Sequence, residues 1–139
     1  MADTMQFDLV SPERRLVSVQ AREVQIPAAE GDMTAMANHE PTITSLRPGV
    51  LIVHTADGAE KYLVTGGFAE ITAEGTTVLA ERAHHVDEVT KDMIDSLVAD
   101  AQKAHQDAHP DVADVTAKLL SDMVAAGEHI GLDPQQPSL

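Results

Sequence analysis

The residues of this chain whose types and spacing could do chemistry are mainly its histidines. His105 and His109 lie four residues apart, a spacing that binds metal when both side chains share one face of a helix. Pro110 follows directly and disfavours a helix through both, so we interpret the two histidines as solvated loop residues. The adjacent His84 and His85 would diverge on an extended backbone, and we interpret them as linker residues. The sequence therefore predicts no metal site.

Motifs for catalysis or cofactor binding are not evident. The sequence contains no Gly-x-Ser-x-Gly elbow, phosphate-binding Gly-x4-Gly-Lys-Ser/Thr loop, Gly-x-Gly-x-x-Gly turn or His-Glu-x-x-His pair. We interpret Gly66-Gly67 as a tight connection between two strands rather than a ligand cradle, because no basic residue lies nearby to hold an anion. We expect a protein without catalytic residues or a cofactor. A small hydrolase and a free-standing ligand-binding module remain the alternatives.

Composition and charge exclude several other classes. The 139 residues include 23 acidic and 9 basic side chains, for a net charge of −14, which disfavours binding to nucleic acid or to an anionic lipid surface. Cysteine is absent, so there is no disulfide scaffold. No apolar run reaches the ~18 residues of a membrane span, and the first residues lack the pattern of a signal peptide. We expect a soluble protein with no direct membrane insertion.

The first part of the chain has the pattern of a β-sandwich. Short β-branched or alternating runs are separated by turn residues, and Asp57-Gly58 and Glu74-Gly75 are strong hairpin signals. The spacing of these runs is typical of an antiparallel sandwich or barrel. The predicted strands cover residues 7–10, 16–19, 23–26, 50–54, 61–65, 68–72 and 76–80.

From residue 86 the apolar spacing changes to that of amphipathic helices. Asp87 is the expected N-cap of the first helix, and a polar break around Pro110 separates it from the second. The apolar stripes predicted to be buried are Val86, Val89, Met93, Leu97 and Ala101, then Val112, Val115, Leu119, Met123 and Ala126. We therefore predict a sandwich domain over 1–85 and an antiparallel two-helix hairpin over 86–139, with a frayed tail from Asp133.

The segment 30–41 stands out between the predicted strands. It reads Glu-Gly-Asp-Met-Thr-Ala-Met-Ala-Asn-His-Glu-Pro. Met33 and Met36 are expected on one strand face, either as core or as an adaptable contact surface for a partner. The residues themselves leave these alternatives open.

This segment and four others resemble the epsilon subunit of bacterial proton-translocating ATP synthases. The others are Phe-Asp-Leu-Val-Ser-Pro at 7–12, Leu-Arg-Pro-Gly at 46–49, Tyr-Leu-Val-Thr-Gly-Gly-Phe-Ala-Glu-Ile at 62–71 and Thr-Val-Leu-Ala-Glu-Arg-Ala at 77–83. The resemblance implies a non-catalytic rotor subunit of the central stalk, which couples the gamma subunit to the membrane c-ring on the cytoplasmic face of the inner membrane. It also leaves open a contact between the hairpin and the alpha and beta subunits.

The resemblance also implies contact residues. The family's ring-contact loop corresponds to Asp32, Met33 and His39, and its gamma contacts correspond to Ser11 and Thr44. For His39 a hydrogen bond that stabilises a turn is an equal alternative.

The hairpin departs from the family pattern. Thr90 stands where nucleotide-binding members carry arginine, and residues 87–139 hold three lysines, no arginine and eleven acids, a net charge of −8. Guanidinium groups that could bind phosphate in a bidentate manner are missing. Nucleotide sensing is therefore expected to be absent, and inhibition of ATP hydrolysis by the hairpin weak or absent. Thr34 replaces a glycine common in the family, so the loop around it is expected to differ in shape.

Overall fold

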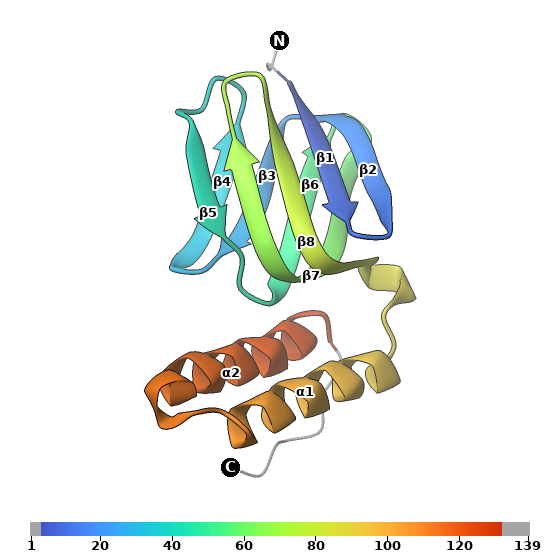
Figure 1. Ribbon diagram of the computed structural model, residues 1–139. Coiled ribbons are helices and arrows are strands. Elements are labelled where there is room, and N and C mark those ends of the chain that lie inside the picture. The colour runs from blue at the N-terminus through green and yellow to red at the C-terminus, as the bar shows by residue number, and fades with distance from the viewer. Residues whose placement is uncertain (1–3, 132–139) are drawn as a thin grey trace. The chain divides into compact units, whose positions relative to one another are not determined.

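The chain divides into two compact units, Met1–His85 and Val86–Leu139. A computed structural model describes residues 4–131, so the predicted frayed tail lies outside the described residues. The first unit consists of strands and the second of helices (Figure 1). The fold class predicted from the sequence, a β-sandwich followed by a two-helix hairpin, is confirmed.

The first unit is a single sheet folded onto itself. Its hydrogen-bonded strand order is β2-β1-β8-β7-β6-β3-β4, with β5 paired to β7. Strands β1 and β8 run parallel, so the sheet is mixed where the sequence predicted antiparallel strands throughout; the long stretch of chain between these two strands permits either direction. The strands are β1 (Met5–Ser11), β2 (Arg14–Ala21), β3 (Glu23–Ala28), β4 (Gly31–Met36), β5 (Thr42–Ser45), β6 (Gly49–Thr55), β7 (Gly58–Ile71) and β8 (Gly75–His85).

Strand β7 closes the sandwich because it belongs to both layers. Its first half pairs with β6, from Gly58 to Val64, and its second half pairs with β5, from Phe68 to Ile71. Strand β8 pairs with both halves of β7. The β7–β8 hairpin therefore carries the sheet from one layer to the other.

Gly66 and Gly67 mark the place where β7 changes layers. Both have positive φ, +66° and +97°, a conformation that side chains disfavour. The prediction that they connect two strands is wrong, because they lie inside one strand. The pairing of β7 with β8 continues in the same register on both sides, from Thr65–Arg82 to Gly67–Ala80, so the glycines bend the strand without ending it.

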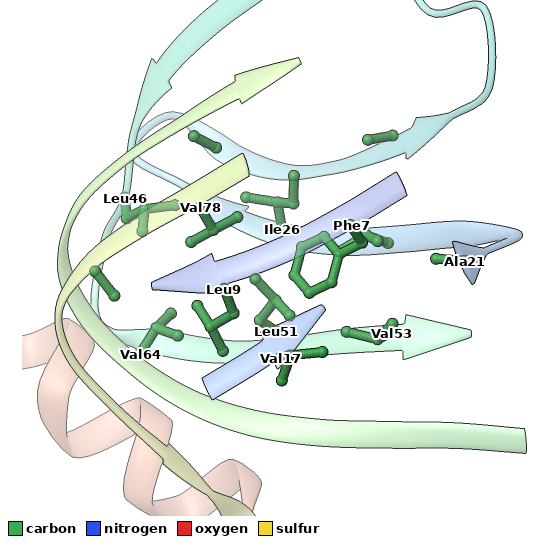
Figure 2. Close-up of a cluster of buried hydrophobic side chains, with 14 of the residues drawn as sticks. Phe7, Leu9, Val17, Ala21, Ile26, Leu46, Leu51, Val53, Val64 and Val78 are labelled. Carbon is green, nitrogen blue, oxygen red and sulfur yellow. The ribbon is translucent and has the colours of Figure 1, made fainter. Parts of the chain in front are cut away.

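The core between the layers is almost entirely aliphatic. Phe7 is its one buried aromatic side chain among the described residues, and Leu9, Ile26, Leu51 and Val78 pack around it (Figure 2). Both layers contribute, since β1 and β8 supply one side and β3 and β6 the other. Dense aliphatic packing of this kind makes the sandwich stiff.

The two adjacent histidines are not linker residues. Strand β8 continues to His85, which pairs with Tyr62 of β7, and His85 Nε2 lies 2.6 Å from Glu60 Oε2. The sequence at 84–85 does not show the apolar alternation that would have predicted a strand. The pairing of β8 with β7 nevertheless extends the strand through both residues.

The second unit holds α1 (Lys91–Gln106) and α2 (Ala113–His129), each preceded by a short 3-10 turn, η1 (Val86–Glu88) and η2 (Pro110–Val112). The N-cap of α1 is Thr90, whose hydroxyl accepts a hydrogen bond from the Met93 amide at 3.2 Å. The prediction of Asp87 as N-cap is wrong because η1 occupies that position. Thr90, which stands at the family's arginine position, is thus a capping residue.

The buried face of α2 also differs from the predicted stripe. Met123 and Ala126 are buried, as predicted, but Leu120 is buried as well, whereas Val112, Val115 and Leu119 are exposed. Two polar contacts lie at the break between the helices. His109 is an exposed loop residue, as expected, whereas His105 is half-buried in the last turn of α1, which corrects the expectation of a solvated loop residue. His105 Nδ1 contacts the Thr116 hydroxyl at 2.8 Å, and the His109 side chain accepts a hydrogen bond from the Asp111 amide at 3.1 Å.

We predict that Gly67→Ala unfolds the sandwich more readily than any other glycine-to-alanine change in β7. A Cβ atom at this position would lie 1.9 Å from the Leu79 carbonyl oxygen, so the two strands would have to separate. The free energy of unfolding should fall by about 3 kcal/mol or more. Tyr62 is the chain's only tyrosine and there is no tryptophan, so tyrosine fluorescence during denaturant unfolding reports on this unit.

Gly58→Ala is the matched control. Gly58 also has positive φ, +126°, but a Cβ atom there would meet nothing within 4 Å. In Gly58→Ala the free energy of unfolding should fall only by the cost of holding a side chain at this φ, about 1–2 kcal/mol. Equal losses for the two variants would show that the approach of β7 to β8 is not the constraint.

Candidate partner-contact surfaces

The turn between β3 and β4 presents the first two predicted contact residues. Asp32 and Met33 lie at the start of β4, opposite Pro27 and Ile26 of β3. The Asp32 side chain is 77% exposed, whereas Met33 is half-buried and packs against the core. Met36 is exposed, so the expectation that both methionines share one face is wrong: residues three apart in a strand point to opposite faces.

Arg47 holds this turn and was not singled out from the sequence. Its guanidinium forms an ion pair with Asp32, and its Nη1 donates to the Ala28 carbonyl oxygen at 2.6 Å. The Arg47 amide also donates to the Pro27 carbonyl oxygen at 3.0 Å. The only available signal was its place in the Leu-Arg-Pro-Gly motif, which does not indicate a contact fifteen residues away.

His39 does not belong to the same loop as Asp32 and Met33. It follows the far end of β4, which is roughly 16 Å long at about 3.3 Å per residue, and the neighbouring Asn38 amide bonds to Ala73 in the β7–β8 turn. The His39 ring contacts the Glu40 carbonyl oxygen at 2.6 Å, through Nδ1. These contacts favour the alternative in which His39 stabilises a turn. The structure does not bring the three predicted ring-contact residues together.

Ser11 and Thr44 belong to the other layer of the sandwich. Ser11 ends β1, and its hydroxyl lies 3.4 Å from the Arg14 carbonyl oxygen in the turn to β2. Thr44 is on the short edge strand β5, where it pairs with the buried Ala69. Its side chain is half-buried on the inward side, so its neighbours Ile43 and Ser45 are the ones that point outward.

An exposed apolar row crosses the outer face of this layer between Ser11 and Thr44. Phe68 of β7 pairs with Leu79 of β8, which pairs with the half-buried Val10 of β1. On β5, Ser45 pairs with Phe68 and Ile43 pairs with Glu70, so Ile43 lies diagonally across from Phe68 on the same face. Ile43, Phe68 and Leu79 are 70%, 43% and 39% exposed. We call Val10, Ile43, Phe68 and Leu79 the apolar row. Adjacent exposed apolar side chains of this kind mark interaction sites on soluble proteins.

The charged groups offer little for chemistry. Within residues 4–131, no group of three histidine, aspartate or glutamate side chains is placed to hold a metal ion. In the hairpin two of the three lysines form ion pairs one helical turn apart, Lys91 with Asp95 at 2.7 Å and Lys118 with Asp122 at 2.6 Å. Neither helix in the described part of the chain is long and apolar enough to span a membrane.

The sequence of this chain is similar to those of known proteins. Residues 4–86 match the family described as ATP synthase, Delta/Epsilon chain, beta-sandwich domain. Over nearly their whole lengths, the chain is similar to two proteins named ATP synthase epsilon chain. That of Ruegeria sp. is 57% identical, with 95% of this chain and 100% of the relative covered. That of Rhodobacter capsulatus is 58% identical, again with 95% and 100% covered.

The fold is also found in solved ATP synthase structures. One chain in the Euglena gracilis mitochondrial ATP synthase, solved as OSCP, F1 and c-ring, matches with a TM-score of 0.70 and 21% identity, covering 91% of this chain and 80% of that one. A chain of the Tetrahymena thermophila enzyme, solved as central stalk and c-ring, matches with a TM-score of 0.62 and 13% identity, covering 91% and 96%. From the matched family and the identities to its bacterial members, the chain belongs to the ATP synthase delta/epsilon chain family, as an epsilon chain of the bacterial type.

Proposed function

We propose that this chain is a non-catalytic rotor subunit that joins the gamma subunit to the c-ring, so that both turn as one body. The relatives named epsilon chains support this role, and so do the two structures of similar fold, which contain the c-ring. The chain is held on the cytoplasmic face of the inner membrane by these partners. The observation that carries the proposal is that an exposed apolar row and an exposed turn bonded by Arg47 lie on different layers of one densely packed sandwich.

The apolar row is the surface proposed for gamma. It lies between Ser11 and Thr44, the two residues that the family resemblance assigns to gamma. Covering Ile43, Phe68 and Leu79 removes apolar area from water, which stabilises a complex at roughly 25 cal/mol per Å². Thr44 faces inward, so its part in the contact is to place Ile43 and Ser45 on the outer face.

The turn of Asp32 and Met33 is the surface proposed for the c-ring. Its exposed carboxylate is held by Arg47, and Met33 adds an apolar side chain of adaptable shape. Because the turn belongs to the layer opposite the apolar row, a ring and a gamma subunit can bind at once. His39 is assigned to the turn after β4 and not to this surface.

The hairpin contributes little to nucleotide binding or to inhibition in this proposal. Its net charge of −8 and lack of arginine oppose binding to phosphate groups and to acidic surfaces of catalytic subunits. A contact with alpha or beta subunits would have to use the exposed side chains of Val112, Val115 and Leu119.

We predict that Phe68→Ser and Leu79→Ser weaken the binding of the full chain to gamma. Both side chains are central to the apolar row, and loss of one central anchor should lower the affinity by about tenfold or more. Titration calorimetry with purified gamma measures this directly. Melting temperatures should change little because both side chains are already partly exposed.

Met36→Ser is the control for this experiment. Met36 is 51% exposed but lies on β4, in the layer opposite the apolar row. Its substitution should leave gamma affinity unchanged. Equal weakening by Met36→Ser, or no weakening by Phe68→Ser and Leu79→Ser, would contradict the assignment of the row to gamma. A chain that shows no affinity for gamma at all would favour the free-standing hydrolase or ligand-binding alternatives.

We predict that deleting residues 87–139 changes ATP hydrolysis by the reassembled soluble complex less than twofold, a small effect in free energy. The acidic hairpin lacks the basic groups that inhibition would need. Steady-state phosphate release from complexes with the full and the shortened chain is the measurement. A rise of several-fold on deletion would mean that the hairpin inhibits despite its charge.

A further inference from the structure

We infer that Arg47 is a positioning residue for the ring-contact turn, and that it fixes the place of Asp32 and Met33 on the sandwich. This inference rests on the proposed ring contact of that turn. It concerns a different residue, which lies on the connection between β5 and β6 and is not itself assigned to a partner.

The guanidinium of Arg47 bridges the two arms of the β3–β4 hairpin. Nη1 donates to the carbonyl oxygen of Ala28, the last residue of β3, at 2.6 Å. Nη2 forms the ion pair with Asp32, near the start of β4. Ala28 and Asp32 lie on opposite sides of the turn, so one rigid planar group ties both arms to a fixed separation.

The backbone around Arg47 anchors this clamp to the rest of the sandwich. The Arg47 amide donates to Pro27 at 3.0 Å, the Ala29 amide donates to Ser45 at 2.8 Å, and the Leu46 amide donates to Gly67 at 3.0 Å. Leu46 itself is buried in the core. The clamp therefore connects the exposed turn to strand β7 through backbone hydrogen bonds.

The exposure of the Arg47 and Asp32 side chains indicates which contact fixes the position of the Arg47 guanidinium. The Arg47 side chain is only 24% exposed, whereas that of Asp32 is 77% exposed. An exposed ion pair contributes little stability by itself, so the half-buried bond to Ala28 orients the guanidinium. The oriented guanidinium then holds the Asp32 carboxylate, which determines how the turn faces a partner.

The number and geometry of the donors matter more than the charge. Lysine carries the same charge but is a point donor on a flexible stem, and it cannot reproduce the rigid fork that reaches both Ala28 and Asp32. Arg47→Lys should therefore behave like Arg47→Gln and not like the wild type. This expectation separates positioning by the fork from a general electrostatic effect.

The first measurement is hydrogen exchange on the full chain, which does not depend on any ring contact. In Arg47→Lys and Arg47→Gln the amides of residues 29–32 should exchange about tenfold faster, because the turn opens locally. Amides in the centres of β6 and β7 should keep their protection, and the melting temperature should stay close to that of the wild type. Unchanged exchange at 29–32 would overturn the inference.

The second measurement is the affinity of the full chain, bound to gamma, for purified c-ring. Both Arg47 variants should bind at least about threefold more weakly, and Arg47→Gln should add little further loss in an Asp32→Ala background. Wild-type affinity in Arg47→Lys would overturn the inference.

Asp32→Ala and Met33→Ala alone separate this inference from the proposed function. If they weaken ring binding and the Arg47 variants do not, the positioning role fails while the ring contact stands. If neither set weakens it, the ring contact at this turn fails as well.

Discussion

The close approach of β7 to β8 at Gly67 is the constraint on which the rest of the sandwich depends. Only a residue without a side chain can bring its backbone against the Leu79 carbonyl, at the left-handed φ of +97° that this bend requires. The bend allows one long hairpin to pair with β6 in one layer and with β5 in the other. The layers are thus closed by continuous backbone hydrogen bonding.

Both proposed contact surfaces are connected to Gly67. Phe68 of the apolar row is the next residue in β7, and the Gly67 carbonyl oxygen accepts the hydrogen bond of Leu46, the neighbour of Arg47. A load applied to the apolar row can therefore reach the turn of Asp32 through a short series of backbone bonds and packed side chains. A rotor joint needs such a stiff connection, and it needs no group with an unusual pKa.

Much of the fold could be predicted from the sequence, because turn signals and apolar periodicity reflect local backbone preferences. The β-rich part, the two helices and the motif around 30–41 followed from such patterns. Features set by distant contacts could not be predicted. The glycine pair in β7, the continuation of β8 through His85, the rotation of α2 that buries Leu120, and the clamp of Arg47 on Asp32 all depend on partners far away in the chain. The assignment of His39 to the ring-contact loop came from the family resemblance, and the resemblance does not indicate that β4 lies between Asp32 and His39.

The most direct test of the account is the number of protons taken up per ATP hydrolysed by membrane vesicles that carry the complete ATP synthase. Vesicles depleted of this chain should hydrolyse ATP with little proton uptake, and adding back the full chain should restore uptake. The reason is that, in the proposed function, the sandwich joins gamma to the ring and performs no reaction itself. A ratio of protons to ATP that is unchanged by removal and return of the chain would contradict the account.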